Sequence, residues 1–236
     1  MNLFRYELKK LSSANYLVAS FLVMLLVPLI TLLWISLNPR AFLLGDFNKM
    51  NLIFLGLIGT KTIFPMTGML LMKVEYDSNG FISAFVSPLE RRKLFLIKFV
   101  IASVWSVLLI LFSVLVVIVT EVILFNDLSI IGLIISQIDA YFYLILYTIP
   151  FIVFGMFLAY AFKHTIIPLI GMSVTIVTGY LMQLFNKNLY LPSAIPEFIL
   201  SPYREAKINT AYLILYTFGI LTVLLMDRMI YKRDNI

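Results

Sequence analysis

The chain of 236 residues contains no Cys and only one His. Disulfides and thiolate metal sites are therefore excluded, and a lone His without a neighbouring ligand pattern predicts no metal site. Charge is scarce as well, because 13% of the residues are charged while 62% are hydrophobic. This composition lies far outside the usual range of soluble domains. It predicts an integral membrane protein with one membrane domain over residues 1–236.

Sequence signatures of catalysis are missing too. No Gly is followed by Lys, which excludes a Walker A phosphate loop and ATP hydrolysis by that route. The chain also lacks a His-Glu-x-x-His motif, paired intramembrane-protease glutamates and a Gly-x-Ser-x-Gly elbow, so we expect no catalytic residues. The net charge of +6 does not require a nucleic acid partner. In a membrane chain, basic residues act as orientation signals and contact anionic lipid headgroups.

Six apolar runs are long enough to cross about 30 Å of hydrocarbon, which takes about 20 helical residues. They lack the alternation of barrel strands, and only helices or closed barrels satisfy the backbone in lipid. The sequence therefore predicts an all-α bundle of six transmembrane helices. These predicted spans cover residues 16–37, 50–72, 99–125, 140–162, 165–185 and 210–226.

Basic residues divide unequally between the two sides of this layout. One side holds twelve, namely Arg5, Lys9, Lys10, Lys73, Arg91, Arg92, Lys93, Lys98, Lys163, Arg228, Lys232 and Arg233. The other side holds five, namely Arg40, Lys49, Lys187, Arg204 and Lys207. By the positive-inside rule, both termini and the loop at residues 73–98 face the cytoplasm.

Three segments outside the spans have an apolar character. Residues 2–13 place apolar side chains on one helical face, which predicts an amphipathic helix on the cytoplasmic leaflet; the alternative is a basic stretch that only orients the first span. The first span itself is too long for a signal peptide, and no cleavage site follows it. Residues 126–139 favour an interfacial segment. Residues 187–209, rich in Pro, form either short helices at the outer leaflet or a plain surface loop.

Two charges fall inside the predicted spans, where each costs about 2.5–3.5 kcal/mol unless it is solvated or paired. Lys61 lies near the middle of the second span, and Glu121 lies about one turn from the outer end of the third. One interpretation places both on a translocation path, where Lys61 reaches toward Glu121. In the other, Glu121 is an ordinary end residue at headgroup level. Separately, Gly171, Thr175 and Gly179 share a face that suits close helix packing, within the chain or in a dimer.

The loop at residues 73–98 is unusual because eight of the 30 charges fall within its 26 residues. It begins with a turn at Asn79 and Gly80 and continues into a short apolar helix around Phe81 and Phe85. Ser87 and Pro88 stop this helix, and a basic helix start then leads into the third span. The short helix is too apolar for a free loop and too short to cross a bilayer. We therefore expect it to dock against a partner.

This segment resembles the coupling segment of type-2 ABC transporter permeases. The matching residues are Glu75, Gly80, residues 82–86, Pro88, Arg91 or Arg92, and Lys98. The six-span layout, the N-terminal amphipathic helix and the apolar outer segment extend the resemblance over essentially the whole chain. The small, all-membrane form looks most like permeases of Gram-positive bacteria, including lantibiotic immunity permeases and exporters of phenol-soluble modulins.

The resemblance implies a half-transporter in the bacterial plasma membrane that exports amphipathic or hydrophobic peptides, such as antimicrobial or toxin-like peptides. Its partners would be a dimer of cytoplasmic ABC ATPase subunits, which carry the ATP and Mg, and a second copy or a homologous permease. No cofactor is implied on this chain. The implied coupling residues are Glu75, Gly80, Phe81, Ile82, Phe85, Ser87, Pro88, Arg91 and Arg92. The alternatives are a secondary transporter or a substrate-binding membrane subunit of another transporter.

Overall fold

The computed structural model describes residue 9 and residues 16–37, 46–77, 88–126, 129–162, 166–184 and 208–234, and every element assigned in these ranges is a helix. The elements are α2 (Tyr16–Leu37), α3 (Asp46–Phe54), the π-helix η2 (Leu55–Ile63), α4 (Phe64–Asp77), α6 (Pro88–Phe125), α7 (Ile130–Ser136), α8 (Ile138–Phe162), α9 (Ile166–Leu184) and α11 (Ile208–Asp234). The predicted all-α class is confirmed for this part of the chain.

Each of the six predicted spans falls on a helix. By length and composition, three helical stretches can cross a membrane within the described ranges, namely Phe47–Lys73, Lys93–Leu124 and Ile138–Phe162. Two shorter apolar stretches, Val18–Leu33 and Pro168–Gly179, accompany them. The chain is therefore a multi-pass membrane protein, whereas the count of six spans stays a prediction.

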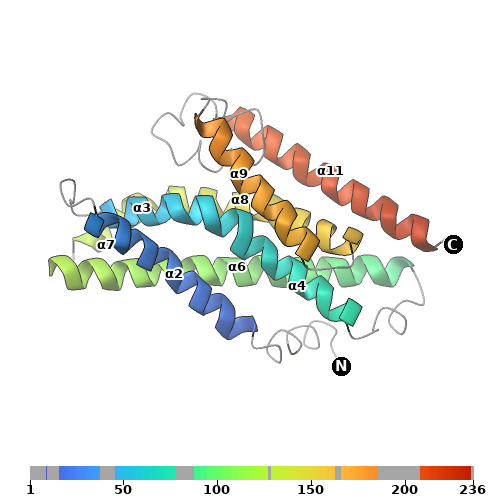
Figure 1. The fold of residues 1–236 in the computed structure, drawn as a ribbon, viewed down its shortest axis with the longest axis horizontal. Helices are drawn as coiled ribbons and strands as arrows, with labels where there is room; N and C mark the ends of the chain where they lie inside the picture. Colours follow the sequence, from blue (N-terminus) through green and yellow to red (C-terminus); the bar gives the residue numbers. More distant parts are fainter. Residues whose placement is uncertain are drawn as a thin grey trace.

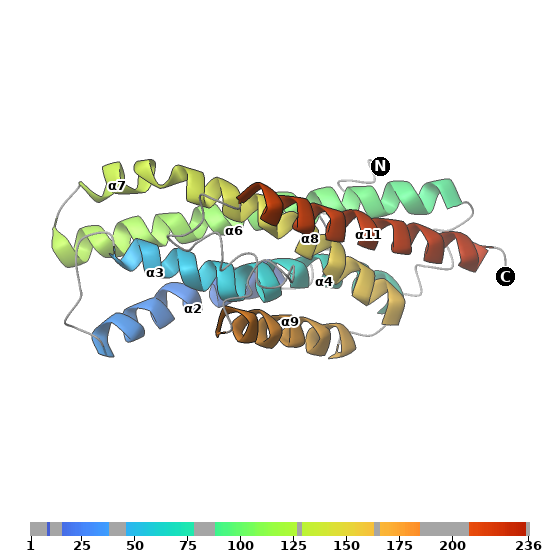
Figure 2. The same ribbon diagram turned by 90° about the horizontal axis from the view of Figure 1, so that it is seen from above.

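The helices form an elongated bundle with the continuous α3–η2–α4 rod at its centre (Figures 1 and 2). The π-helical part of this rod contacts α2, α8 and α9. At one end of the bundle α4 finishes, α6 begins and α11 finishes, and we call this the charged end. At the opposite end α3 begins and α6 finishes.

Helix α6 is the longest element, with 38 residues. It begins at Pro88, which the sequence pattern predicts as the stop of the short coupling helix; the fixed backbone and missing N–H of Pro suit the first helical position. It ends at Asn126, whose φ of 51° is left-handed and whose N–H donates to the Val122 carbonyl at 2.8 Å. Asn tolerates this conformation better than most residues, so it can close a helix C-terminus.

The closest helix packing joins α4 to α8 through two glycines. A Cβ on Gly155 would lie 2.7 Å from the Pro65 carbonyl oxygen, and one on Gly68 would lie 2.6 Å from Met156 Cγ. Both backbones approach this closely only because neither glycine has a side chain. At Gly171, which the sequence points to for close packing, the nearest side-chain atom would be 3.3 Å away. The tight contact thus lies elsewhere in the bundle.

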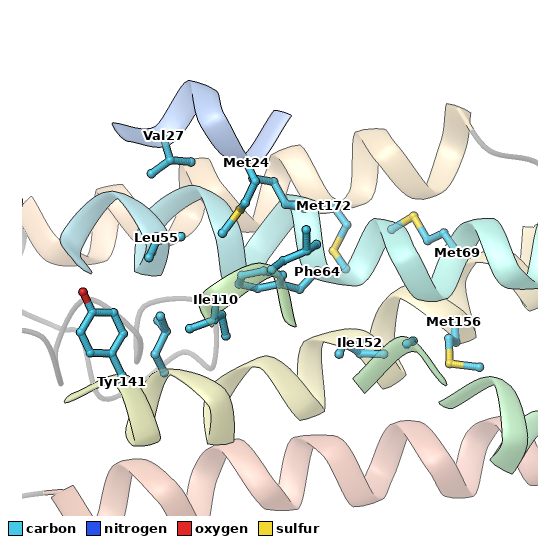
Figure 3. Close-up of a cluster of buried hydrophobic side chains, with 14 of the residues drawn as sticks. Met24, Val27, Leu55, Phe64, Met69, Ile110, Tyr141, Ile152, Met156 and Met172 are labelled. Atoms are coloured by element: carbon cyan, nitrogen blue, oxygen red, sulfur yellow. The ribbon is translucent and has the colours of Figure 1, made fainter. Parts of the chain in front are cut away.

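The core is formed by apolar side chains from every long helix around the central rod. Figure 3 shows part of this cluster, with residues contributed by α2, η2, α4, α6, α8 and α9: Met24, Val27, Leu55, Phe64, Met69, Ile110, Tyr141, Ile152, Met156 and Met172. Aromatic side chains extend the core between α2 and α6, where Phe21 makes edge contacts with Trp105 and Phe112. The bundle is therefore packed through its centre in the described residues.

Several predictions concern segments outside this packed bundle. Residues 126–139 contain the short helix α7, with Ile134 buried and Ile131 and Ile135 exposed, a one-sided pattern that agrees with an interfacial segment. The predicted helix at residues 2–13 lies outside the described residues except for Lys9, which is helical and exposed. The outer connection lies outside them up to residue 207.

Candidate functional site

The charged end of the bundle is built from helices that continue past their apolar parts. Helix α6 would be about 57 Å long at 1.5 Å per residue, almost twice the hydrocarbon thickness of about 30 Å. Its uncharged part, residues 99–120, is enough to span that thickness. Residues 88–98, with five charges, therefore extend about 16 Å beyond the apolar part. Helices α4 and α11 end in charged residues at the same end.

The predicted coupling residues lie between α4 and α6. Glu75 is in the last turn of α4, and Pro88, Arg91 and Arg92 are in the first turns of α6. The others lie outside the described residues: Gly80, Phe81, Ile82, Phe85 and Ser87. The structure thus places both ends of the segment on helices that meet at the charged end (Figure 1).

Lys98 joins these two helices. Its side chain is fully buried, and its Nζ donates a hydrogen bond of 2.7 Å to the Leu71 carbonyl oxygen. A buried ammonium is costly unless it is hydrogen-bonded, and bonds from charged donors are among the stronger ones in proteins. Because Lys98 is the last residue of the segment at residues 73–98 and Leu71 lies just before its start, this bond ties the two ends of the segment together.

Glu121 belongs to a second buried polar cluster, at the opposite end. Its side chain is fully buried, and its Oε1 accepts the Asn48 backbone N–H at 3.0 Å. Asn48 is in the first turn of α3, where backbone N–H groups have no partner within the helix and favour a negative charge. The Asn48 side chain then accepts a hydrogen bond from the Tyr141 hydroxyl and donates one of 2.8 Å to Gln137 Oε1.

This cluster ties α3 to both α6 and α8. The interpretation that Glu121 faces the bundle interior agrees with its burial. One turn along the same rod, Asn51 donates a further hydrogen bond of 3.1 Å to Ser113 on α6. Sequence reasoning missed Asn48 and Asn51, although two Asn residues three positions apart before an apolar span are a readable signal of a polar face.

Lys61 lies on the π-helix η2 and is also fully buried. Just beyond η2, Pro65 has no N–H for the Lys61 carbonyl, and its ring disfavours a regular α-helical turn there, which is compatible with π-helical bonding. The Phe64 N–H accordingly bonds the Gly59 carbonyl, five residues back. The hydroxyls of Thr60 and Thr62 donate to the carbonyls four residues before them. Pi-helical turns occur frequently at functional sites.

Lys61 and Glu121 are separated along the length of the rod. Glu121 bonds Asn48, which precedes Lys61 by 13 residues on the same rod, a separation of about 20 Å for an α-helix. The π turns shorten this distance somewhat, but it remains far beyond the length of one Lys side chain. Lys61 and Glu121 therefore lie at separate levels of the bundle, and the translocation path through them stays a prediction.

No group of three or more His, Asp or Glu side chains within the described ranges could hold a metal ion.

Comparison with known proteins decides the family. The family model described as "ABC-2 family transporter protein" matches residues 3–182, well over half of the chain. The chain belongs to the ABC-2 transporter family. No curated protein and no solved structure matches it. An ABC-2 permease is the membrane subunit of an ABC transporter, a generally non-catalytic chain that works with an ABC ATPase.

Family membership gives the charged end of the permease a functional context. The matched region includes both helices that flank residues 78–87, together with Lys98 and its partner Leu71. It also includes the Glu121 cluster and Lys61. The buried polar contacts described above therefore all lie within the transporter part of the chain.

Proposed function

We propose that this permease is the membrane-spanning subunit of an ATP-driven exporter of amphipathic or hydrophobic peptides. A separate ABC ATPase dimer powers it, and the permease pairs with a second copy or with a homologous permease. The peptide class rests on the resemblance to lantibiotic immunity permeases and phenol-soluble modulin exporters. The 20 Phe and 13 Tyr of the permease would suit a peptide that enters from the lipid, although helix packing and the aromatic belts at the membrane interfaces use the same residue types.

The observation that carries the proposal is the Lys98 hydrogen bond to Leu71 between the helices that flank residues 78–87. If the segment docks on the ATPase, a movement of the segment reaches α4 and α6 together, because the buried bond joins them. Force would thus pass into the central rod and the longest helix at once. An ordinary connecting loop needs no such attachment.

Disruption of the coupling segment tests this role. We expect Phe81→Asp combined with Phe85→Asp to abolish co-purification of the ATPase, because both residues lie on the predicted apolar face. Ser83→Asp adds a charge on the polar side of the same segment and should leave co-purification intact. If the double variant keeps both ATPase binding and peptide-stimulated ATP hydrolysis, the coupling role is refuted. Peptide transport that continues without the ATPase would favour a secondary transporter.

The peptide class has a separate test in proteoliposomes that contain the permease and its ATPase. An amphipathic helical peptide should stimulate ATP hydrolysis. A scrambled peptide of the same composition, which has no apolar face, should not. Equal stimulation by both peptides would contradict the proposed substrate class.

The proposed topology has six spans, a single membrane domain and both termini in the cytoplasm of a bacterial cell. Lys49 and Lys93 are both exposed and lie at opposite ends of the bundle. Since the chain has no Cys, each can be replaced by Cys as the only thiol. In intact cells, a membrane-impermeant maleimide should label Lys49→Cys but not Lys93→Cys. The reverse pattern would invert the topology.

A further inference from the structure

The central rod and α8 run side by side in the same direction. Three contacts show this, because they pair residues 88 to 93 positions apart in the same order along both helices: 48 with 141, 65 with 155, and 68 with 156. The same range of offsets places Pro150, inside α8, beside residues 57–62 of the rod. These residues lie within the π-helix η2.

Both neighbouring helices are therefore interrupted at the same level. In the rod, Pro65, just beyond η2, leaves the Lys61 carbonyl without its α-helical donor. In α8, Pro150 cannot donate to the carbonyl of residue 146. Helix α6, which packs on both, continues from Pro88 to Phe125 without a Pro after its first residue. Helix α2 also has a Pro in its interior, Pro28, so the interruptions are not confined to the rod and α8.

On each side of this level the pair is joined by different contacts. Toward the charged end, Gly68 and Gly155 bring the backbones of α4 and α8 into direct contact. Toward the opposite end, Asn48 bonds Gln137 and Tyr141, and Glu121 adds α6 to the group. Each half of the pair is thus a tightly connected unit. Between the halves, the rod has π-helical bonds, and α8 stays α-helical but lacks the one bond that Pro150 cannot donate.

We propose that Leu55–Ile63 and Pro150 form a single hinge level, at which the charged-end halves of the rod and α8 pivot together against the opposite-end halves. This inference rests on the proposed function, in which the ATPase moves the coupling segment attached to α4. Helix α6 has no interruption, so it follows by tilting about its attachment at Glu121. Hinge motions of this kind are a common way to pass a local event across a protein.

The expected displacement can be estimated from the lever length. Phe162 lies 12 residues beyond Pro150, about 18 Å along the helix. A rotation of about 15°, similar to the subunit rotation of haemoglobin, moves its end by about 5 Å. Spin labels on Phe162 and on Val18 at the start of α2 would report this movement, since both positions are exposed. Labels on Met66 and Phe162 lie within one unit and serve as the control.

The first experiment uses the isolated permease in lipid nanodiscs, so it needs no ATPase. Because the chain has no Cys, two introduced Cys residues carry the only labels. The Val18–Phe162 distance distribution should be broader than that of Met66–Phe162. Pro65→Ala with Pro150→Ala should narrow this distribution, because Ala restores the missing N–H. Ala also keeps the Cβ, which lies near Gly155 in the case of Pro65 and near Gly219 of α11 in the case of Pro150. Pro150→Ala alone should narrow the distribution partly.

Pro168→Ala is the matched control, because Pro168 lies in the first turn of α9, where a backbone N–H has no helical partner. It should leave the distribution unchanged. A Val18–Phe162 distribution as narrow as that of Met66–Phe162, or one that the Pro65 and Pro150 substitutions do not alter, would overturn the hinge.

The second experiment adds the ATPase. Trapping ATP should shift the Val18–Phe162 distance by about 5 Å, as estimated above from the lever, and leave Met66–Phe162 in place. Suppose that the complex binds ATP and shows peptide-stimulated ATP hydrolysis, but the Val18–Phe162 distance does not change. This result would refute the hinge, while the proposed function would stand. Failure of the ATPase to bind would refute the proposed function, and the nanodisc result would still decide whether the hinge exists.

Discussion

Replacing Gly155 by Ala should destabilise the permease, and the size of the effect follows from the contact distance. The added Cβ would lie 2.7 Å from the Pro65 carbonyl oxygen and 3.0 Å from its Cβ. Part of that surface is backbone, which cannot rotate away, so the two helices must separate. Overpacking of this kind costs about 1–3 kcal/mol. Ala also gains about 1 kcal/mol in helix propensity, which partly masks the loss.

A matched series separates these two effects. Gly132, in α7, has nothing within 4 Å of an added Cβ, so Gly132→Ala reports the helix propensity alone. The difference between Gly155→Ala and Gly132→Ala should therefore be the full packing cost of about 1–3 kcal/mol. Gly68→Ala should fall between them, since its nearest neighbour, Met156 Cγ, belongs to a flexible side chain.

The assay is reversible unfolding in mixed micelles, followed by circular dichroism as the denaturing detergent is increased. The expected order of stability is Gly132→Ala, then Gly68→Ala, then Gly155→Ala. If Gly155→Ala is as stable as Gly132→Ala, the α4 and α8 backbones do not meet at Gly155. The charged-end unit proposed above would then lose its main contact.

Two further substitutions probe the buried polar contacts. Tyr141→Phe removes the hydroxyl that bonds the Asn48 side chain and should cost about 1 kcal/mol in the same unfolding assay, whereas an unchanged stability would show that this bond contributes nothing. Lys98→Met keeps the apolar stem but loses the donor to the Leu71 carbonyl. Because burying the charge is itself costly, the free energy of unfolding should change by less than about 1 kcal/mol. ATPase binding should persist, whereas peptide-stimulated ATP hydrolysis should fall. Hydrolysis that remains coupled in Lys98→Met would show that the bond has no role in transmission.

The positions of the helices could be predicted from sequence because they depend on local properties. A run of about 20 apolar residues is helical in lipid whatever surrounds it, since no other open structure satisfies its backbone. Pro88 likewise marks the start of α6 by its own backbone chemistry. The coupling segment at residues 78–87 lies outside the described residues, so its short helix stays a prediction.

The faces of those helices could not be predicted in the same way. In a soluble bundle the apolar stripe of a helix points to the core, but a membrane helix is apolar on its lipid side as well. Val119 is exposed and Val117 is buried on the same helix, and nothing in their chemistry separates them. For the same reason, the sequence pattern pointed to Gly171 as a site of close helix packing, whereas the tight contact lies at Gly155.

Sequence alone determined the membrane class, the helical segments and the resemblance to a transporter permease, because hydropathy, chain breakers and short motifs are local. Tertiary structure decided which charges meet. Glu121 bonds the first turn of α3, and the direction of the central rod places Lys61 13 residues further along it. The coincidence of η2 with Pro150 is also a matter of assembly, since two segments far apart in sequence share a level only through the register in which their helices pack.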